Sequence, residues 1–178
     1  MSRLDDRWNE RRKRNGWEPV ASLGYAESIR IAAPANVVWS FCHSAETAHL
    51  TDASIIRGYT APGTPPEGLG EHQCFDYRGP DGSTNTVVLE VVALEHGRSA
   101  TTVRLPGRWP RTTTTVDPNG SGCILTLDMW LPVWEQWSAE PEWAPELITA
   151  FDELLAWTDA YLERVKVWTE GGWTPTRT

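Results

Sequence analysis

Residues 71–77 hold the richest set of side chains for proton transfer, and they alternate as a β-strand does. Alternation places His72 and Asp76 on one face, where the carboxylate could orient the imidazole as a general base toward an acidic C–H or hydroxyl. Phe75 and Tyr77 lie on the opposite face. Two orientations are open. We favour the one in which the aromatic rings fill the interior and His72 and Asp76 face solvent.

Arg104 is the third candidate for chemistry, because it interrupts an apolar stretch between Val103 and Leu105. The simpler interpretation is an exposed arginine on a strand. If the side chain points inward, its guanidinium requires a partner and could hold a ligand carbonyl, enolate or carboxylate. His72, Asp76 and Arg104 are therefore the catalytic candidates of the sequence.

The sequence contains no established catalytic or metal-binding signature. It has no G-x-S-x-G, no glycine-rich phosphate loop and no H-E-x-x-H. His43 and His49 are separated by a predicted helix break, which is poor spacing for metal ligands. We therefore expect neither a metal nor a cofactor.

Composition excludes several classes of protein. The chain has 178 residues, of which 40% are hydrophobic, and this suits one folded domain with a substantial core. The formal net charge of −8 argues against a general nucleic-acid binder. We find neither an apolar run long enough to span a membrane nor a signal-peptide pattern. Three scattered cysteines do not form a disulfide framework, so we expect a cytoplasmic location.

Two kinds of element must position the candidate residues. Residues 145–168 carry apolar side chains at steps of three and four, which predicts one long amphipathic helix. Before it, a strand over 25–31 is followed by two short helices over 34–42 and 44–50, and then by about six strands. Short turns between these strands, the last at residues 117–120, predict an antiparallel meander. A curved sheet would supply the broad apolar surface that the helix needs.

The opening segment 27–39, E-S-I-R-I-A-A-P-A-N-V-V-W, resembles that of the START-like superfamily, also called SRPBCC. It shows a strand that ends in I-x-A, a helix led by proline and a V-W pair. This superfamily includes the birch-pollen-allergen type and the polyketide cyclase/dehydratase group, and the resemblance spans about residues 23–168. It implies an α+β helix-grip fold, in which a curved antiparallel sheet of about seven strands wraps around the C-terminal helix.

The resemblance also implies a cavity between sheet and helix, where members of the superfamily bind lipids, steroids, polyketides and other apolar molecules. Side chains on the faces that we expect to point inward are the predicted ligand contacts. From the strands these are Phe75, Tyr77, Thr101, Val103, Leu125, Leu127 and Met129, and from the helix Phe151, Leu154, Thr158 and Tyr161. Among the 11 tryptophans, Trp109, Trp134 and Trp143 are candidates for the cavity mouth.

Three functions remain open. The first is binding of a hydrophobic, aromatic or polycyclic molecule, polyketide- or lipid-like, in natural-product biosynthesis or self-resistance. The second is an enzyme of the polyketide cyclase/dehydratase type that uses the same cavity. The third is a regulatory module that binds a partner, or a second copy of itself as a homodimer, through exposed aromatic side chains.

Three segments are expected in the domain organisation. Residues 1–18 are dense in charge and predict an arm ahead of the domain. Residues 19–170 form the START-like domain, and residues 171–178 form a tail.

Overall fold

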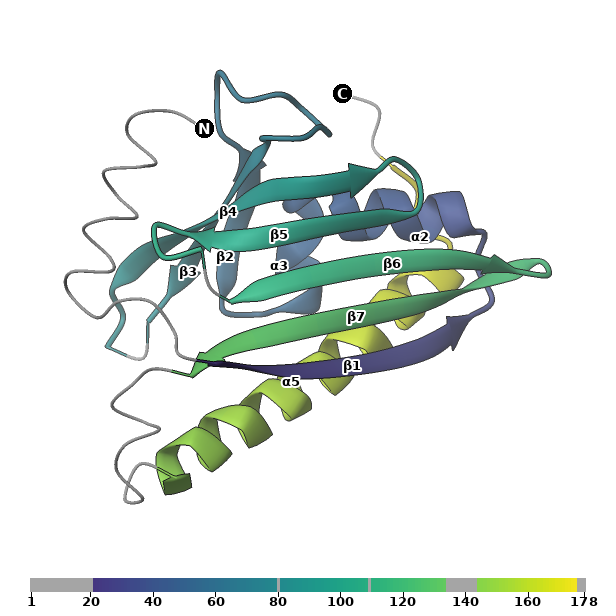
Figure 1. Ribbon diagram of the computed structural model, residues 1–178. Helices are drawn as coiled ribbons and strands as arrows, with labels where there is room; N and C mark the ends of the chain where they lie inside the picture. Colours follow the sequence, from purple (N-terminus) through teal and green to yellow (C-terminus); the bar gives the residue numbers. More distant parts are fainter. Residues whose placement is uncertain (1–20, 80, 109, 134–143, 176–178) are drawn as a thin grey trace.

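The computed structural model describes residues 21–79, 81–108, 110–133 and 144–175, so the predicted arm at 1–18 lies outside the described residues (Figure 1). The elements, in chain order, are β1 (Ala21–Ile31), α2 (Ala35–His43), the 3₁₀ turn η1 (Ala45–Thr47), α3 (Ala48–Thr51), β2 (Ile55–Thr60), β3 (His72–Arg78), β4 (Thr84–Glu95), β5 (Ser99–Leu105), β6 (Arg111–Asn119), β7 (Gly122–Val133) and α5 (Ala144–Glu170). This order confirms the predicted sequence of strand, short helices, strands and long helix.

The seven strands form one antiparallel sheet in the order β1-β7-β6-β5-β4-β3-β2. Strands β2 to β7 follow one another as a meander, and β1 closes the sheet beside β7, as predicted. The predicted turn at residues 117–120 is wrong in position. Strand β6 continues through Pro118, and Asn119 pairs with Gly122, so the chain reverses at Gly120 and Ser121. The backbone of Gly120 has a φ of 64°, which glycine adopts without strain.

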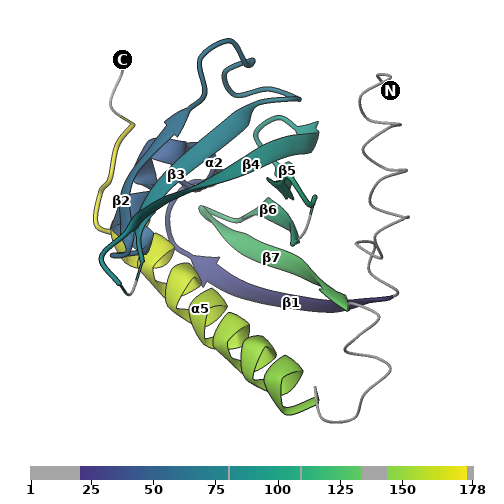
Figure 2. The same cartoon turned by 90° about the vertical axis from the view of Figure 1, so that its left-hand side faces the viewer.

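Helix α5 lies along the concave side of the curved sheet (Figure 2). It packs mainly against β1, α2 and α3. The helix ends where Gly172 adopts a φ of 90°. The predicted tail then begins with a docked residue, because the ring of Trp173 packs edge-on against Phe41, with 5.0 Å between ring centroids.

The segment from α2 to α3 is held tightly against both β2 and α5. Gly58 makes the first contact possible, since a Cβ atom at this position would clash with the carbonyl oxygen of Ala45. Three side chains of α5 make the second contact. The indole of Trp168 donates to the carbonyl of Leu50 at 3.1 Å, the guanidinium of Arg164 donates to the carbonyl of Thr51, and the indole of Trp157 donates to a carboxylate oxygen of Asp52 at 3.3 Å.

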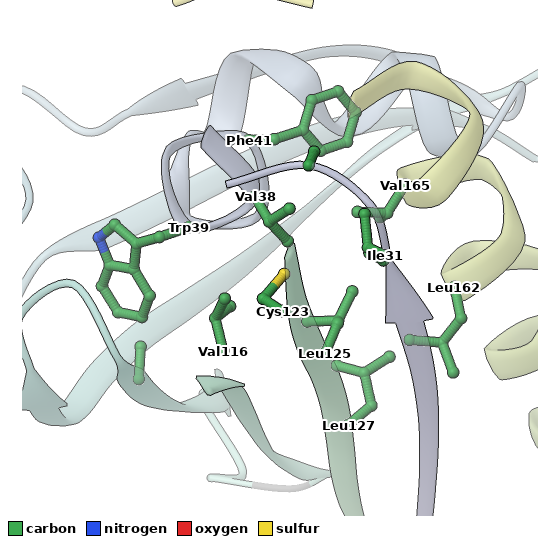
Figure 3. Packing of buried hydrophobic residues seen from close by; sticks show 12 residues of the cluster. Ile31, Val38, Trp39, Phe41, Val116, Cys123, Leu125, Leu127, Leu162 and Val165 are labelled. Atoms are coloured by element: carbon green, nitrogen blue, oxygen red, sulfur yellow. The ribbon is translucent and has the colours of Figure 1, made fainter. Parts of the chain in front are cut away.

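The hydrophobic core occupies one end of the space between sheet and helices (Figure 3). We call this region the packed end. Its fully buried members include Ile31, Val38, Val116, Leu125 and Val165, which come from β1, α2, β6, β7 and α5. All five are apolar and close-packed, as a stable core requires.

Only part of the apolar stripe predicted for the long helix is buried. Leu162 and Val165 lie in the core, whereas Ile148 is 59% exposed and Trp168 is 42% exposed. The stripe predicted from spacing is therefore wrong at Ile148 and Trp168, whereas Thr169, beside Trp168 in the last turn, is buried.

Candidate functional site

A cavity of about 550 Å³ lies between the concave face of the sheet and the helices. We call this region the cavity end. Apolar and aromatic side chains dominate its wall, with a few polar groups among them. The principal lining residues are Trp39, Phe41, Cys42, His43, Thr51, Asp52, Ile55, Gln73, Phe75, Tyr77, Val87, Leu89, Ala100, Thr102, Arg104, Thr112, Thr114, Leu127, Met129, Trp157 and Tyr161.

The register of the sheet explains which strand residues face the cavity, because directly paired residues share a face. Gln73 pairs with Leu89, which pairs in turn with Arg104, and all three line the cavity. Farther across the sheet, Thr102 pairs with Thr112 and Thr112 with Met129. These two rows put a cation, an amide and hydroxyl groups on an otherwise apolar floor.

Two aromatic residues of α5 form the opposite wall. The rings of Trp157 and Tyr161 stack with 5.3 Å between centroids and 18° between planes. The hydroxyl of Tyr161 meets the thiol of Cys42, and burial raises the pKa of the thiol to about 12. Burial also raises the pKa of Tyr161 well above its ordinary value. Both groups are thus neutral at physiological pH and serve as hydrogen-bonding groups rather than bases.

A buried pair of ionisable side chains joins His43, which lines the cavity, to Glu71, which is not among the lining residues. The two side chains are 6% and 3% exposed, and His43 Nε2 lies 3.5 Å from Glu71 Oε2. The ring of His43 also stacks on Trp39, with 4.9 Å between centroids. Burial lowers the pKa of His43, and the nearby carboxylate of Glu71 partly offsets this. Sequence reasoning missed this pair, because no spacing connects the end of α2 with the start of β3.

The aromatic face of β3 points into the cavity, and the catalytic candidates on its other face do not. Phe75 and Tyr77 line the cavity, whereas His72 and Asp76 are not among the lining residues. Asp76 instead accepts hydrogen bonds from Thr86 at 2.6 Å and from Arg57 at 2.6 Å. These two bonds, Thr86 first, lower the pKa of Asp76. Asp76 is therefore committed to outer-face partners and does not orient His72.

Strand β5 presents the face opposite to the predicted one. Ala100, Thr102 and Arg104 line the cavity, while Thr101 and Val103 are buried on the other side of the sheet. Assigning Thr101 and Val103 to the cavity was thus wrong. Both faces of this strand are buried near its start, so the alternation of apolar residues does not reveal which face is inner. The guanidinium of Arg104, on the cavity face of this strand, forms no ion pair with any described residue.

Of the four helix residues predicted to contact the ligand, only Tyr161 lines the cavity. Phe151 packs edge-on against Tyr25 of β1, at 6.0 Å, and neither it nor Leu154 lines the cavity. Thr158 is fully buried, and its hydroxyl donates to the carbonyl of Leu154 at 2.9 Å. Thr158 is a predicted ligand contact that does not line the cavity, because the helix itself satisfies its hydroxyl. Tyr161 does line the cavity.

Strand β7 follows its predicted pattern, with Leu127 and Met129 at the cavity wall. Leu125 is deeper, in the packed end. The proposed mouth residues Trp109, Trp134 and Trp143 lie outside the described residues. Within the described ranges, no cluster of three or more His, Cys, Asp or Glu side chains is placed to hold a metal ion. No helix in the same ranges has the length and apolar character needed to cross a membrane.

A curved antiparallel sheet of seven strands, a long C-terminal helix on its concave side and two short helices after the first strand define the helix-grip fold of START-like proteins. Among solved structures, this chain is similar to the di-domain ARO/CYC StfQ from the steffimycin biosynthetic pathway, with a TM-score of 0.65 and 15% identity. The match covers 94% of this chain and 60% of StfQ, so the chain spans less than two thirds of that protein.

Two proteins whose length is similar to that of this chain also share the fold. The polyketide_cyc-like protein Cgl2372 from Corynebacterium glutamicum matches at a TM-score of 0.58 and 19% identity, over 88% of this chain and 99% of its own. Major latex-like protein 151 from Panax ginseng matches at a TM-score of 0.61 and 14% identity. This match covers 83% of the present chain and 97% of the ginseng protein. No protein-family model and no curated protein matches the sequence. At these identities, the likeness establishes the fold.

Proposed function

We propose that this protein binds a hydrophobic, aromatic or polycyclic small molecule in the cavity between sheet and helix. The observation that carries the proposal is the cavity of about 550 Å³ in a domain whose other end is fully packed. Concave, mostly apolar sites of this size with a few polar groups are typical of small-molecule binding. Aromatic rings from three sides, including Phe75, Trp39 and Trp157, suit a flat ligand.

The polar groups of the wall indicate that the ligand also carries oxygen atoms. The hydroxyls of Thr102, Thr112 and Thr114 form no side-chain hydrogen bond with other described residues, and Arg104 has no carboxylate partner there. A ligand with carbonyl or hydroxyl groups would pair with them. A polyketide-like aromatic has this combination, and the likeness to a protein of the steffimycin pathway supports a place in natural-product biosynthesis or self-resistance.

We also propose that the protein works in the cytoplasm. Its three cysteines, Cys42, Cys74 and Cys123, are free thiols. Unpaired cysteines suit a reducing compartment.

Titration with two fluorescent probes tests the binding proposal. One probe is anionic, 1-anilinonaphthalene-8-sulfonate, and the other is the neutral N-phenyl-1-naphthylamine. We expect both to bind the wild type and to quench tryptophan fluorescence, since Trp39 and Trp157 line the cavity. Arg104→Gln should weaken the anionic probe about tenfold or more and leave the neutral one unchanged, because one charge-assisted hydrogen bond is worth about 1.5–3 kcal/mol.

A matched pair of substitutions locates the bound probe. Val87 lines the cavity, and Val88, the next residue of β4, faces the other side of the sheet. Val87→Trp should fill the void and abolish probe binding, whereas Val88→Trp should leave it intact. A wild type that binds neither probe, or equal effects of the two substitutions, would contradict the proposal.

The enzyme interpretation is the second candidate, and one specific observation favours it. That observation is the buried pair of His43 and Glu71, because His43 lines the cavity and ionisable groups with perturbed surroundings are a feature of catalytic sites.

A further inference from the structure

Two buried polar atoms have no hydrogen-bond partner and lie close to each other, and one of them belongs to a residue that lines the cavity. They are His43 Nε2 and Glu71 Oε2, separated by 3.5 Å, which is longer than a normal hydrogen bond. Buried polar groups in proteins are nearly always hydrogen-bonded, and an unpaired one is costly. An ordinary core position would not retain such a pair, so the arrangement points to a role in which its state changes.

The surroundings hold both side chains in place. Glu71 Oε1 accepts a hydrogen bond from the hydroxyl of Thr60 at 2.8 Å, which leaves Oε2 for the histidine. The main-chain carbonyl of His43 accepts a hydrogen bond from the side-chain amide of Gln73 at 2.8 Å, and the ring stacks on Trp39. The imidazole therefore has a fixed orientation, with one nitrogen directed at Glu71.

The second ring nitrogen, Nδ1, is the one available to a bound molecule. His43 lines the cavity, and Nδ1 forms no hydrogen bond with any described residue. A carboxylate beside Nε2 favours the tautomer in which Nε2 carries the hydrogen, so Nδ1 then presents a lone pair. Burial lowers the pKa of His43, which keeps the ring neutral at physiological pH and leaves one nitrogen lone pair free to accept a proton.

We propose that His43 is a general base for the cavity ligand and that Glu71 is its positioning residue. The proposal rests on the proposed function, because it requires a ligand in the cavity. Nδ1 removes a proton from a C–H bond next to a ligand carbonyl, and the electron pair moves to the carbonyl oxygen to form an enolate. The imidazolium returns the proton to a hydroxyl that leaves the neighbouring carbon. The products are an unsaturated carbonyl compound and water.

Three features stabilise the charges that develop in this step and have little effect before it. His43 is the last residue of α2, where the helix dipole favours a cation. The Glu71 carboxylate can shorten its contact as the ring becomes positive. Arg104 lines the cavity in the same row as Gln73, two strands away, so roughly 10 Å separate the Cα atoms of these two residues. The guanidinium of Arg104 suits an enolate oxygen.

A generic substrate for proton abstraction tests the proposal without knowledge of the natural ligand. The probe is 5-nitrobenzisoxazole, a flat aromatic molecule. A base removes its C3 proton, the N–O bond breaks, and the isomeric cyanonitrophenolate is detected by its absorbance. We expect His43→Gln to lower the rate at saturating probe by about 100-fold or more, the usual scale for loss of a general base. His49→Gln, an exposed residue outside the cavity, is the matched control.

The pH profile supplies a readout that a merely structural role would not change. The titratable groups around His43 are Glu71, Glu67 and His96. Activity should fall as the pH drops through the pKa of His43, which burial lowers from the ordinary value of a histidine. Glu71→Gln removes the charge that raises this pKa, so the acid limb should move to lower pH and the rate should drop about tenfold.

The outcomes separate the two proposals. If the wild type binds 1-anilinonaphthalene-8-sulfonate but does not accelerate the reaction, or if His43→Gln retains the wild-type rate, the general base is refuted and the binding function stands. If the wild type binds neither 1-anilinonaphthalene-8-sulfonate nor N-phenyl-1-naphthylamine, the binding function fails. If His43→Gln loses its cooperative melt, the position of the acid limb in the wild type and in Glu71→Gln decides the question.

Discussion

The packed end and the cavity end lie between the same sheet and the same helix, yet one is filled and the other is hollow. At the packed end, side chains of α2 such as Val38 reach into the space that Leu125 and Val165 leave. At the cavity end, α2 contributes wall residues such as His43, but no side chain fills the space between them and Phe75 or Leu89. The difference shows that the sheet and α5 alone do not fill the fold. The short helix α2 decides how far the core extends.

Leu125→Ala should produce the largest loss of stability. This side chain is fully buried at the packed end, and its neighbours come from several elements, so the site cannot collapse around the gap. We expect the free energy of unfolding to fall by about 3–5 kcal/mol in urea melts. A loss below about 1 kcal/mol would show that the packed end is not close-packed.

Phe151→Ala should have an intermediate effect. Its ring is only partly buried and packs against Tyr25 in the early half of α5, away from the packed end. We expect a loss of about 2 kcal/mol, less than the range for a fully buried phenylalanine. Ile148→Ala, at an exposed position of the same helix, is the control and should change stability by less than about 0.5 kcal/mol. A Phe151→Ala loss as large as that of Leu125→Ala would contradict the distinction between the two halves.

Leu89→Ala should lower the free energy of unfolding by less than Leu125→Ala does. Leu89 already borders a void, so truncation enlarges a cavity without breaking a close-packed cluster. We expect a loss of about 1 kcal/mol, from the partial burial of its methyl groups. Equal losses for the two leucines would mean that the cavity end is packed.

A substitution on the outer face of the sheet, Asp76→Asn, should have the smallest effect on stability, and this effect should depend on pH. Hydrogen bonds from Thr86 and Arg57 lower the pKa of Asp76 in the folded protein. A lowered pKa adds stability above the unfolded pKa, and this part is lost as the pH falls through the folded pKa. Asp76→Asn should therefore reduce the difference in stability between pH 7 and pH 3. Asp52 and Asp81, whose pKa values are also lowered, retain their own contributions. An unchanged difference would mean that the two hydrogen bonds are not formed in solution.

Most of the fold was predictable because turns and alternation are local properties. Gly82 and Gly97 marked two turns of the meander, and the alternation of β7 identified Leu127 and Met129 as inner residues. The same rule failed for Thr101 and Val103, since β5 is buried on both faces. A face can be identified from the sequence only where the other face meets solvent.

The candidate site was less predictable, because it depends on contacts between distant segments. The alternation of residues 71–77 placed Glu71 on the same face as Phe75, but it gave no sign of a histidine opposite. His43 reaches Glu71 only because the fold brings the end of α2 close to the residue before β3. The rotation of α5 likewise follows from its packing on β1 and α2, which the apolar stripe does not encode.

The contact between α5 and residues 50–52 constrains the amino-acid sequence of α5 more than the sequence of residues 50–52. Trp168 and Arg164 donate to main-chain carbonyls, those of Leu50 and Thr51. Any amino acid at positions 50 and 51 offers the same carbonyl, whereas the donors on the helix are specific side chains. The two hydrogen bonds themselves therefore place no requirement on the side chains at 50 and 51, whereas they require a long donor side chain at 164 and 168. The helix side of this contact thus bears nearly all of its sequence requirement.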